Sequence, residues 1–181
     1  MAEQGTQTVN IFIREVTVHD ARDPWPGHGE YDVSFVGAAT PSRAAPEARS
    51  GVRWTHSVQR GHGYPVGSWT GPVTFPSTHS LVVAGAGEEL DRFRNDALQG
   101  GLSILSADHD WGVGRWWQTK NGPHFDFLFF VARVPPAADG AAPQNPTDPV
   151  WAAAATQDAP GPSKPTFDEY AGAFGAPLPQ G

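Results

Sequence analysis

The amino-acid sequence predicts an all-β domain, an antiparallel eight-stranded β-sandwich, followed by an extended tail rich in proline and alanine. Three observations lead to this prediction. Short apolar segments rich in β-branched and aromatic residues recur through residues 1–134, and clusters of turn-forming residues separate them. Helical periodicity is absent there, apart from a turn expected near Glu88–Leu98. After residue 134 the composition changes abruptly.

Alternation of apolar and polar residues marks the strands. Tyr31, Val33 and Phe35 alternate with polar neighbours, which places their side chains on one face of a strand. Strands are expected at 9–18, 30–36, 52–59, 71–75, 79–84, 101–105 and 124–134, with turns at 24–29, 38–51, 61–67 and 121–123. Seven or eight short strands in a domain of this length are typical of an antiparallel sandwich or barrel.

Residues 135–181 form the tail, which contains 10 of the 18 prolines. Such a segment buries too little apolar area to offset its ordering entropy, so in isolation it should be extended. Two apolar spots interrupt it: a tryptophan followed by four alanines, and a short candidate helix with aromatic residues on one face. The tail is therefore either a plain linker or an arm that docks on its own domain or on a neighbour. The arm contacts are expected at Trp151, Phe167, Tyr170 and Phe174.

Charge and cysteine usage exclude several classes of protein. The 181 residues carry a net charge of −7 and few lysines, which argues against nucleic-acid binding and against a polybasic membrane face. The absence of cysteine excludes disulfides and thiolate metal sites. The longest apolar stretch, 125–134, is interrupted by Asp126 and Arg133 and is shorter than the roughly 20 residues of a membrane-spanning helix. We expect a protein of the cytoplasm without a transmembrane segment.

The sequence contains no catalytic motif. A Gly-x-Ser-x-Gly elbow and a phosphate-binding loop are both missing. Two clusters, 108–110 and His124 with Asp126, combine imidazole and carboxylate groups that suit a transition metal, but their spacing provides no convergent ligand set. Turn and rim positions are the favoured interpretation of both. We therefore expect a non-enzymatic protein.

Acidic residues gather in two loops. One group surrounds the first loop and the other lies near residue 90. Carboxylates crowded together repel one another, which raises the cost of ionising them all. A calcium ion relieves that repulsion, because it takes 6–8 oxygen ligands and tolerates irregular loops. The two loops would form such a site if they met at one end of the sandwich.

The order of these segments resembles the C2 domain family across residues 9–134. Residues 16–33 are similar to the C2 opening, a strand, an Ala-Arg-Asp turn and an acidic residue before an aromatic one. Residues 54–76 are similar to its middle, with a Trp-containing turn, and residues 81–100 resemble its third loop, in which acidic residues precede two apolar residues and a glycine. The resemblance implies a calcium-dependent module that binds an anionic phospholipid or a protein partner. It also implies five calcium ligands: Asp23, Glu30, Glu89, Asp91 and Asp96.

The expected loop tips carry aromatic and basic residues. Such residues suit the headgroup zone of an anionic membrane, where Trp is favoured and Arg binds phosphate. Contacts with a membrane or a partner are therefore expected at Trp25, Arg92, Phe93 and Arg94. The alternative is that Trp25 covers a sandwich edge and Phe93 packs beneath its own loop.

A second function also fits the sequence. In it, the domain is a metal-independent scaffold and the C-terminal arm makes subunit contacts in a homo-oligomer or a larger assembly. In the first function the protein is instead peripheral to a membrane.

Overall fold

The structure, a computed structural model, describes residues 5–20, 29–41, 48–90 and 95–134. Eight strands and a short 3-10 helix follow one another along the chain. They are β1 (Thr6–Val18), β2 (Gly29–Thr40), β3 (Ala48–Val58), β4 (Gly63–Pro76), β5 (Ser80–Glu89), β6 (Asp96–Leu105), η1 (Ala107–Gly112), β7 (Trp116–Gln118) and β8 (Phe125–Arg133). In the described part of the chain, no helix is long and apolar enough to cross a membrane.

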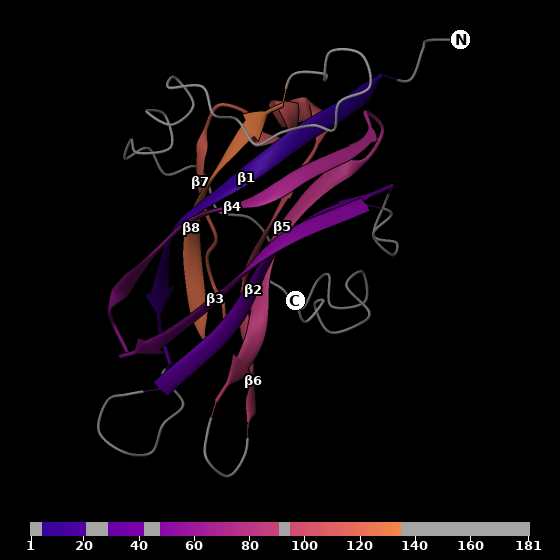
Figure 1. Cartoon of the computed structure of the whole chain (residues 1–181). Coiled ribbons are helices and arrows are strands. Elements are labelled where there is room, and N and C mark those ends of the chain that lie inside the picture. The colour runs from indigo at the N-terminus through magenta and orange to yellow at the C-terminus, as the bar shows by residue number, and fades with distance from the viewer. Residues whose placement is uncertain (1–4, 21–28, 42–47, 91–94, 135–181) are drawn as a thin grey trace.

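The strands form one strongly curved sheet (Figure 1). Its order is β3-β2-β5-β6-β8-β1-β4, and β7 pairs with β8 outside this path. Neighbouring strands are antiparallel except β6 and β8, which run parallel and meet at a single pair, Gly100 and Phe125. The two terminal strands, β3 and β4, also lie next to each other, so the sheet curls almost into a barrel.

The prediction of an all-β domain is confirmed, but the arrangement is closer to a barrel than to the predicted sandwich. The contact between Gly100 and Phe125 joins what would otherwise be two separate sheets. On the other side, β3 and β4 are linked by side chains: the Trp54 indole Nε1 donates a hydrogen bond to the Pro65 carbonyl, 3.2 Å away, and Ser50 donates to the Thr70 carbonyl. We call this line of contact the β3–β4 seam.

Prolines explain why the seam lacks a regular ladder. Pro65, Pro72 and Pro76 lie in β4, which pairs with β1 on its other side. Proline has no backbone N–H, so it is tolerated on a strand at the edge of the hydrogen-bonded order. The glycines and the proline of 61–67 predict a turn, but this prediction is wrong from Gly63 onward, where β4 already begins.

The expected helical turn near Glu88–Leu98 is wrong at both of its ends. Glu88 and Glu89 close β5, and Asp96 to Leu98 open β6. The two strands pair in register, Glu89 opposite Asp96. Residues 91–94, which connect them, lie outside the described residues.

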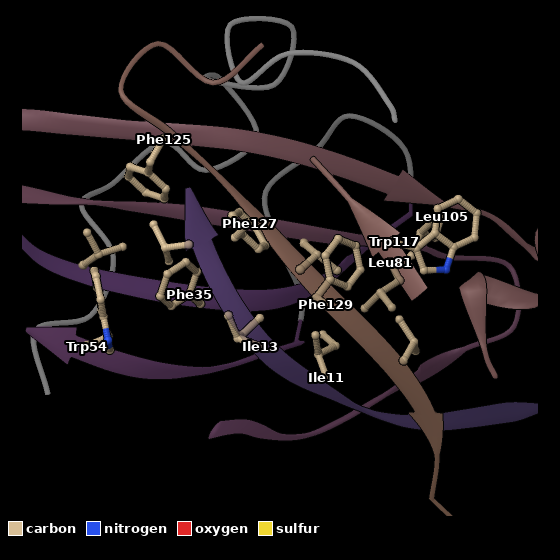
Figure 2. Packing of buried hydrophobic residues seen from close by; sticks show 14 of the residues in the cluster. Ile11, Ile13, Phe35, Trp54, Leu81, Leu105, Trp117, Phe125, Phe127 and Phe129 are labelled. Atoms are coloured by element: carbon tan, nitrogen blue, oxygen red, sulfur yellow. The ribbon is translucent and has the colours of Figure 1, made fainter. Parts of the chain in front are cut away.

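The interior of the barrel holds a single large aromatic and aliphatic core (Figure 2). The predicted inward face of β2 is confirmed, because Tyr31, Val33 and Phe35 are all fully buried. Phe35 packs edge-on against Phe127 of β8, with ring centroids 5.0 Å apart. Such aromatic contacts supply much of the apolar area of a small β domain.

Strand β1 changes its alternation within the core. Ile11 and Ile13 point inward on odd positions, whereas Val16 and Val18 do so on even positions. A register shift between Ile13 and Glu15 accounts for the change, because one extra residue turns the following side chains to the other face.

One end of the barrel is closed by aromatic side chains from η1 and β7. The Trp111 indole donates to the His79 carbonyl (2.8 Å), and the Trp117 indole donates to the Gly112 carbonyl (2.9 Å). Trp111 and Gly112 adopt left-handed φ angles of 49° and 75°, which direct this segment into the barrel mouth. We call this the aromatic end.

Candidate functional site

The opposite end of the barrel brings together the roots of the two acidic loops. Tyr31 of β2 lies opposite Glu89 of β5, and Glu89 lies opposite Asp96 of β6. The backbone N–H of Leu90 donates to the Glu30 carbonyl, 2.7 Å away. Because β2 begins and β5 ends at this edge, the segments 21–28 and 91–94 both leave the barrel here. We call it the acidic end.

The predicted calcium ligands are divided by the faces of the sheet. Glu89 and Asp96 are cross-strand partners and so share the inner face with Tyr31, and Glu89 is buried. Glu30 precedes Tyr31, so its exposed side chain lies on the outer face. Asp23 and Asp91 lie outside the described residues, as do Trp25, Arg92, Phe93 and Arg94. Within the described ranges, no group of three or more His, Cys, Asp or Glu residues could hold a metal ion.

The outer face at this end carries an ion pair. The Arg53 guanidinium donates from Nε to Asp32 Oδ1 (2.6 Å) and makes a second hydrogen bond to Oδ2. These bonds hold the pKa of the Asp32 carboxyl below its usual range and raise the pKa of Arg53. Arg53 is the only basic residue of the expected strand 52–59, so the positive charge of that strand is already occupied by Asp32.

A buried carboxylate, Asp126, organises the acidic end from the outer face of β8, between the core residues Phe125 and Phe127. Its Oδ2 lies 2.8 Å from His19 Nε2, while its Oδ1 accepts hydrogen bonds from the Thr119 hydroxyl (2.9 Å) and the Gly122 N–H (3.2 Å). The Thr119 hydroxyl in turn accepts from the Phe127 N–H. Both oxygens of Asp126 are therefore engaged, and the group ties the end of β1 to the β7–β8 connection.

His124 fastens the same region through its backbone and its ring. Its Nδ1 accepts a hydrogen bond from the Gln99 N–H (2.9 Å), and its carbonyl accepts from the N–H groups of His19 and Asp20. An Nδ1 atom that accepts a hydrogen bond cannot bind a metal ion at the same time.

The two clusters considered for a transition metal lie at opposite ends of the molecule. His124 and Asp126 belong to the acidic end, whereas Asp110 lies in η1 at the aromatic end, where it pairs with Arg133 (2.5 Å). The chain therefore does not combine them into one site. Sequence reasoning missed the contact between His19 and Asp126 because the two residues are 107 positions apart.

The described carboxylates of the acidic end fall into two sets. Its fixed carboxylates occupy hydrogen bonds that hold strands together, while the remaining acidic groups stand at the roots of two loops. Comparisons with known proteins add no relative: the sequence matches no family model and no curated protein.

Proposed function

We propose that the protein is a non-enzymatic, C2-like binding module that holds calcium between its first and third loops and thereby binds an anionic phospholipid surface. The observation that carries the proposal is the pairing of β2, β5 and β6. It makes both acidic loops leave the barrel at one edge, with Glu30, Glu89 and Asp96 at their roots.

Electrostatic repulsion supports a cation at this edge. Glu89 faces Asp96 across β5 and β6, and like charges directly opposite each other in a sheet destabilise it. Glu88 and Glu30 add negative charge on the outer face. A calcium ion with Asp23 and Asp91 as further ligands would relieve this repulsion, because its oxygen ligands need no regular geometry.

The sheet also supports the C2-like part of the proposal. It divides into two four-stranded halves, β3-β2-β5-β6 and β7-β8-β1-β4, joined through the single pair of Gly100 and Phe125. Two packed halves of this size are the layers that a sandwich requires. In the proposal, Trp25 and Phe93 enter the lipid headgroup zone while Arg92 and Arg94 bind phosphate.

Calorimetric titration with calcium, followed by sedimentation with vesicles of anionic phospholipid, tests the proposal. We expect heat of binding, a calcium-dependent rise in melting temperature and calcium-dependent sedimentation, because a ligand of the native state stabilises it. Asp96→Asn should weaken calcium binding by about tenfold. Asp108→Asn, which changes an exposed carboxyl at the aromatic end, is the matched control and should leave it unchanged. The absence of both heat and stabilisation at millimolar calcium would refute the proposal.

A second candidate function is a metal-independent scaffold of a larger assembly. It is favoured by partly exposed apolar residues on the outer face of β1, β4 and β8: Phe12, Trp69 and Leu128. Sedimentation equilibrium without calcium separates the two functions, because only the scaffold function predicts a concentration-dependent oligomer in that buffer.

A further inference from the structure

The outer face of β2, β5 and β6 changes character along the strands. Towards the acidic end it carries two acidic residues, Asp32 and Glu88, which lie opposite each other on β2 and β5. Further along it carries apolar side chains in direct cross-strand register, Val36 with Ala84, Ala38 with Val82, and Ala84 with Leu102, before it ends at Thr40 opposite Ser80. We call these five apolar residues the outer band.

The outer band is buried although it points away from the core. Val36, Val82 and Ala84 are each 1% exposed, and Ala38 and Leu102 are 0% exposed. Side chains on the free face of a sheet stand perpendicular to it and expose their tips to solvent. Values this low therefore require a cover.

The described elements do not provide that cover. The strands β1 and β4 lie against β2 on its inner side, where a side chain at Gly37 would meet Ile11 and Val73. Within residues 5–20, 29–41, 48–90 and 95–134, the main contacts of β2, β5 and β6 are with their neighbours in the sheet, with β1 and β4 on the inner side, and with η1 at the aromatic end. The outer side of the band is thus left for a segment outside these ranges, or for another molecule, to cover.

The location of the outer band and the composition of the remaining segments indicate which segment covers it. Segments 21–28 and 91–94 leave from the acidic end, away from the band. Segments 1–4 and 42–47 are short and contain no aromatic residue. The remaining segment is 135–181, which carries the aromatic residues expected to make arm contacts.

The chain enters that segment at the appropriate end of the barrel. The Val134 N–H donates to the Thr8 carbonyl near the start of β1, and Arg133 pairs with Asp110 of η1 at the aromatic end. From there, residues 135–150 reach roughly 20 Å even as a random coil. Charge also fits, because the tail is acidic and Arg49 is exposed on β3 beside Ala38.

We propose that residues 135–181 of the same chain fold back over the outer band and cover it with their apolar residues. The band is then an intramolecular docking surface and not an open interface for another molecule. Docking of the tail on the outer band does not require calcium, so its test is separate from the test of the proposed function.

Thiol reactivity in the full-length chain tests the inference, because the natural sequence has no cysteine to interfere. Ala84→Cys introduces one thiol into the band, and Ala97→Cys introduces one on the same face at an exposed position of β6. We expect a soluble thiol reagent to modify the first at least about tenfold more slowly than the second, because reaction there requires local opening. Equal rates would overturn the proposal.

A tail variant then identifies the cover. In the Ala84→Cys chain, replacing Trp151, Phe167, Tyr170 and Phe174 by serine should raise the rate towards that of Ala97→Cys. The matched control replaces the tail glutamines Gln144, Gln157 and Gln180 by serine and should leave the rate low. Circular dichroism checks that each variant keeps the native β signal. A rate that stays low in the aromatic variant would overturn the proposal.

Dilution distinguishes an intramolecular cover from a second copy. The reaction rate of Ala84→Cys should not change over a hundredfold range of protein concentration. A rate that rises on dilution would assign the cover to another molecule and overturn the proposal.

Discussion

The two ends of the barrel are closed by different chemistry. At the aromatic end, Trp111 and Trp117 fill the mouth and direct their indole N–H groups to backbone carbonyls. At the acidic end, Asp126 and His19 join the strands through polar contacts, and two connections leave the barrel beside them. Apolar closure stabilises through buried area, whereas polar closure exchanges protein–water for protein–protein hydrogen bonds with a smaller net gain. We therefore expect the aromatic end to contribute more to stability.

The largest effect is expected for Trp117→Ala. Trp117 is fully buried, so its removal loses a large apolar area and leaves the Gly112 carbonyl without its indole donor. The free energy of unfolding should fall by about 3–5 kcal/mol, measured by urea denaturation. Trp69→Ala, at a half-buried position on the outer face, is the control and should cost clearly less. Equal losses would contradict a special role for the aromatic end.

A pair of glycine variants tests how tightly the same end is packed. Gly112 and Gly114 have nearly equal φ angles of 75° and 73°. A Cβ at Gly112 would lie 2.5 Å from Trp117 Nε1, whereas a Cβ at Gly114 would meet nothing within 4 Å. Gly114→Ala should cost only the left-handed strain of about 1–2 kcal/mol, and Gly112→Ala should cost about 1–3 kcal/mol more. Thermal unfolding of both variants measures the difference. Identical melting temperatures would show that Trp117 can move aside for the added Cβ without loss of stability.

At the acidic end, a change of Asp126, the side chain with the most hydrogen bonds there, should reduce stability less than the changes at the aromatic end. Asp126→Asn keeps the shape but replaces one acceptor oxygen by a donor, so that at least one of the bonds to His19, Thr119 and Gly122 is lost. We expect a loss of about 1–3 kcal/mol in the free energy of unfolding by urea titration. His19→Gln should cost below about 1 kcal/mol, because that side chain is 43% exposed. A larger loss for His19→Gln than for Asp126→Asn would reverse this order.

The smallest effect belongs to the ion pair of Asp32 and Arg53, and it depends on pH. The pKa of Asp32 is lowered in the folded state from an ordinary value of 3.8, chiefly by the hydrogen bonds from Arg53. Its stabilisation is therefore complete above that ordinary value and is lost as the pH falls through the lower, folded-state pKa. Asp32→Asn should thus reduce stability at pH 7 and make no difference at strongly acidic pH. Urea titrations across this range check it, and a difference that persists in strong acid would contradict the assignment.

The parts of the fold that could be predicted are those with a clean local pattern. Tyr31, Val33 and Phe35 alternate with polar residues, and their burial follows from that alternation alone. The short strand β7 was not predicted, because three residues are too few to show a period. Both of its tryptophans are also buried: Trp117 in the core and Trp116 against Phe12 and Phe130 on the outer face.

Features that depend on tertiary contacts could not be predicted from local sequence. The prolines of β4 are typical of a turn, and only the position of that strand at the edge makes them compatible with a strand. The contact of His19 with Asp126 joins distant residues. Glu30 and Glu89 both stand near a loop, but the register of β2 and β5 places them on opposite faces, and register is a property of paired strands.

The β3–β4 seam has a consequence for how the molecule behaves in a crowded solution. Unpaired strand edges attract strands of other molecules and so initiate aggregation. Here Pro65, Pro72 and Pro76 remove backbone donors from one border, and Trp54 and Ser50 of the other border already donate side-chain hydrogen bonds across it. The sheet thus remains open in its hydrogen-bonding pattern and yet offers a neighbouring chain little to pair with.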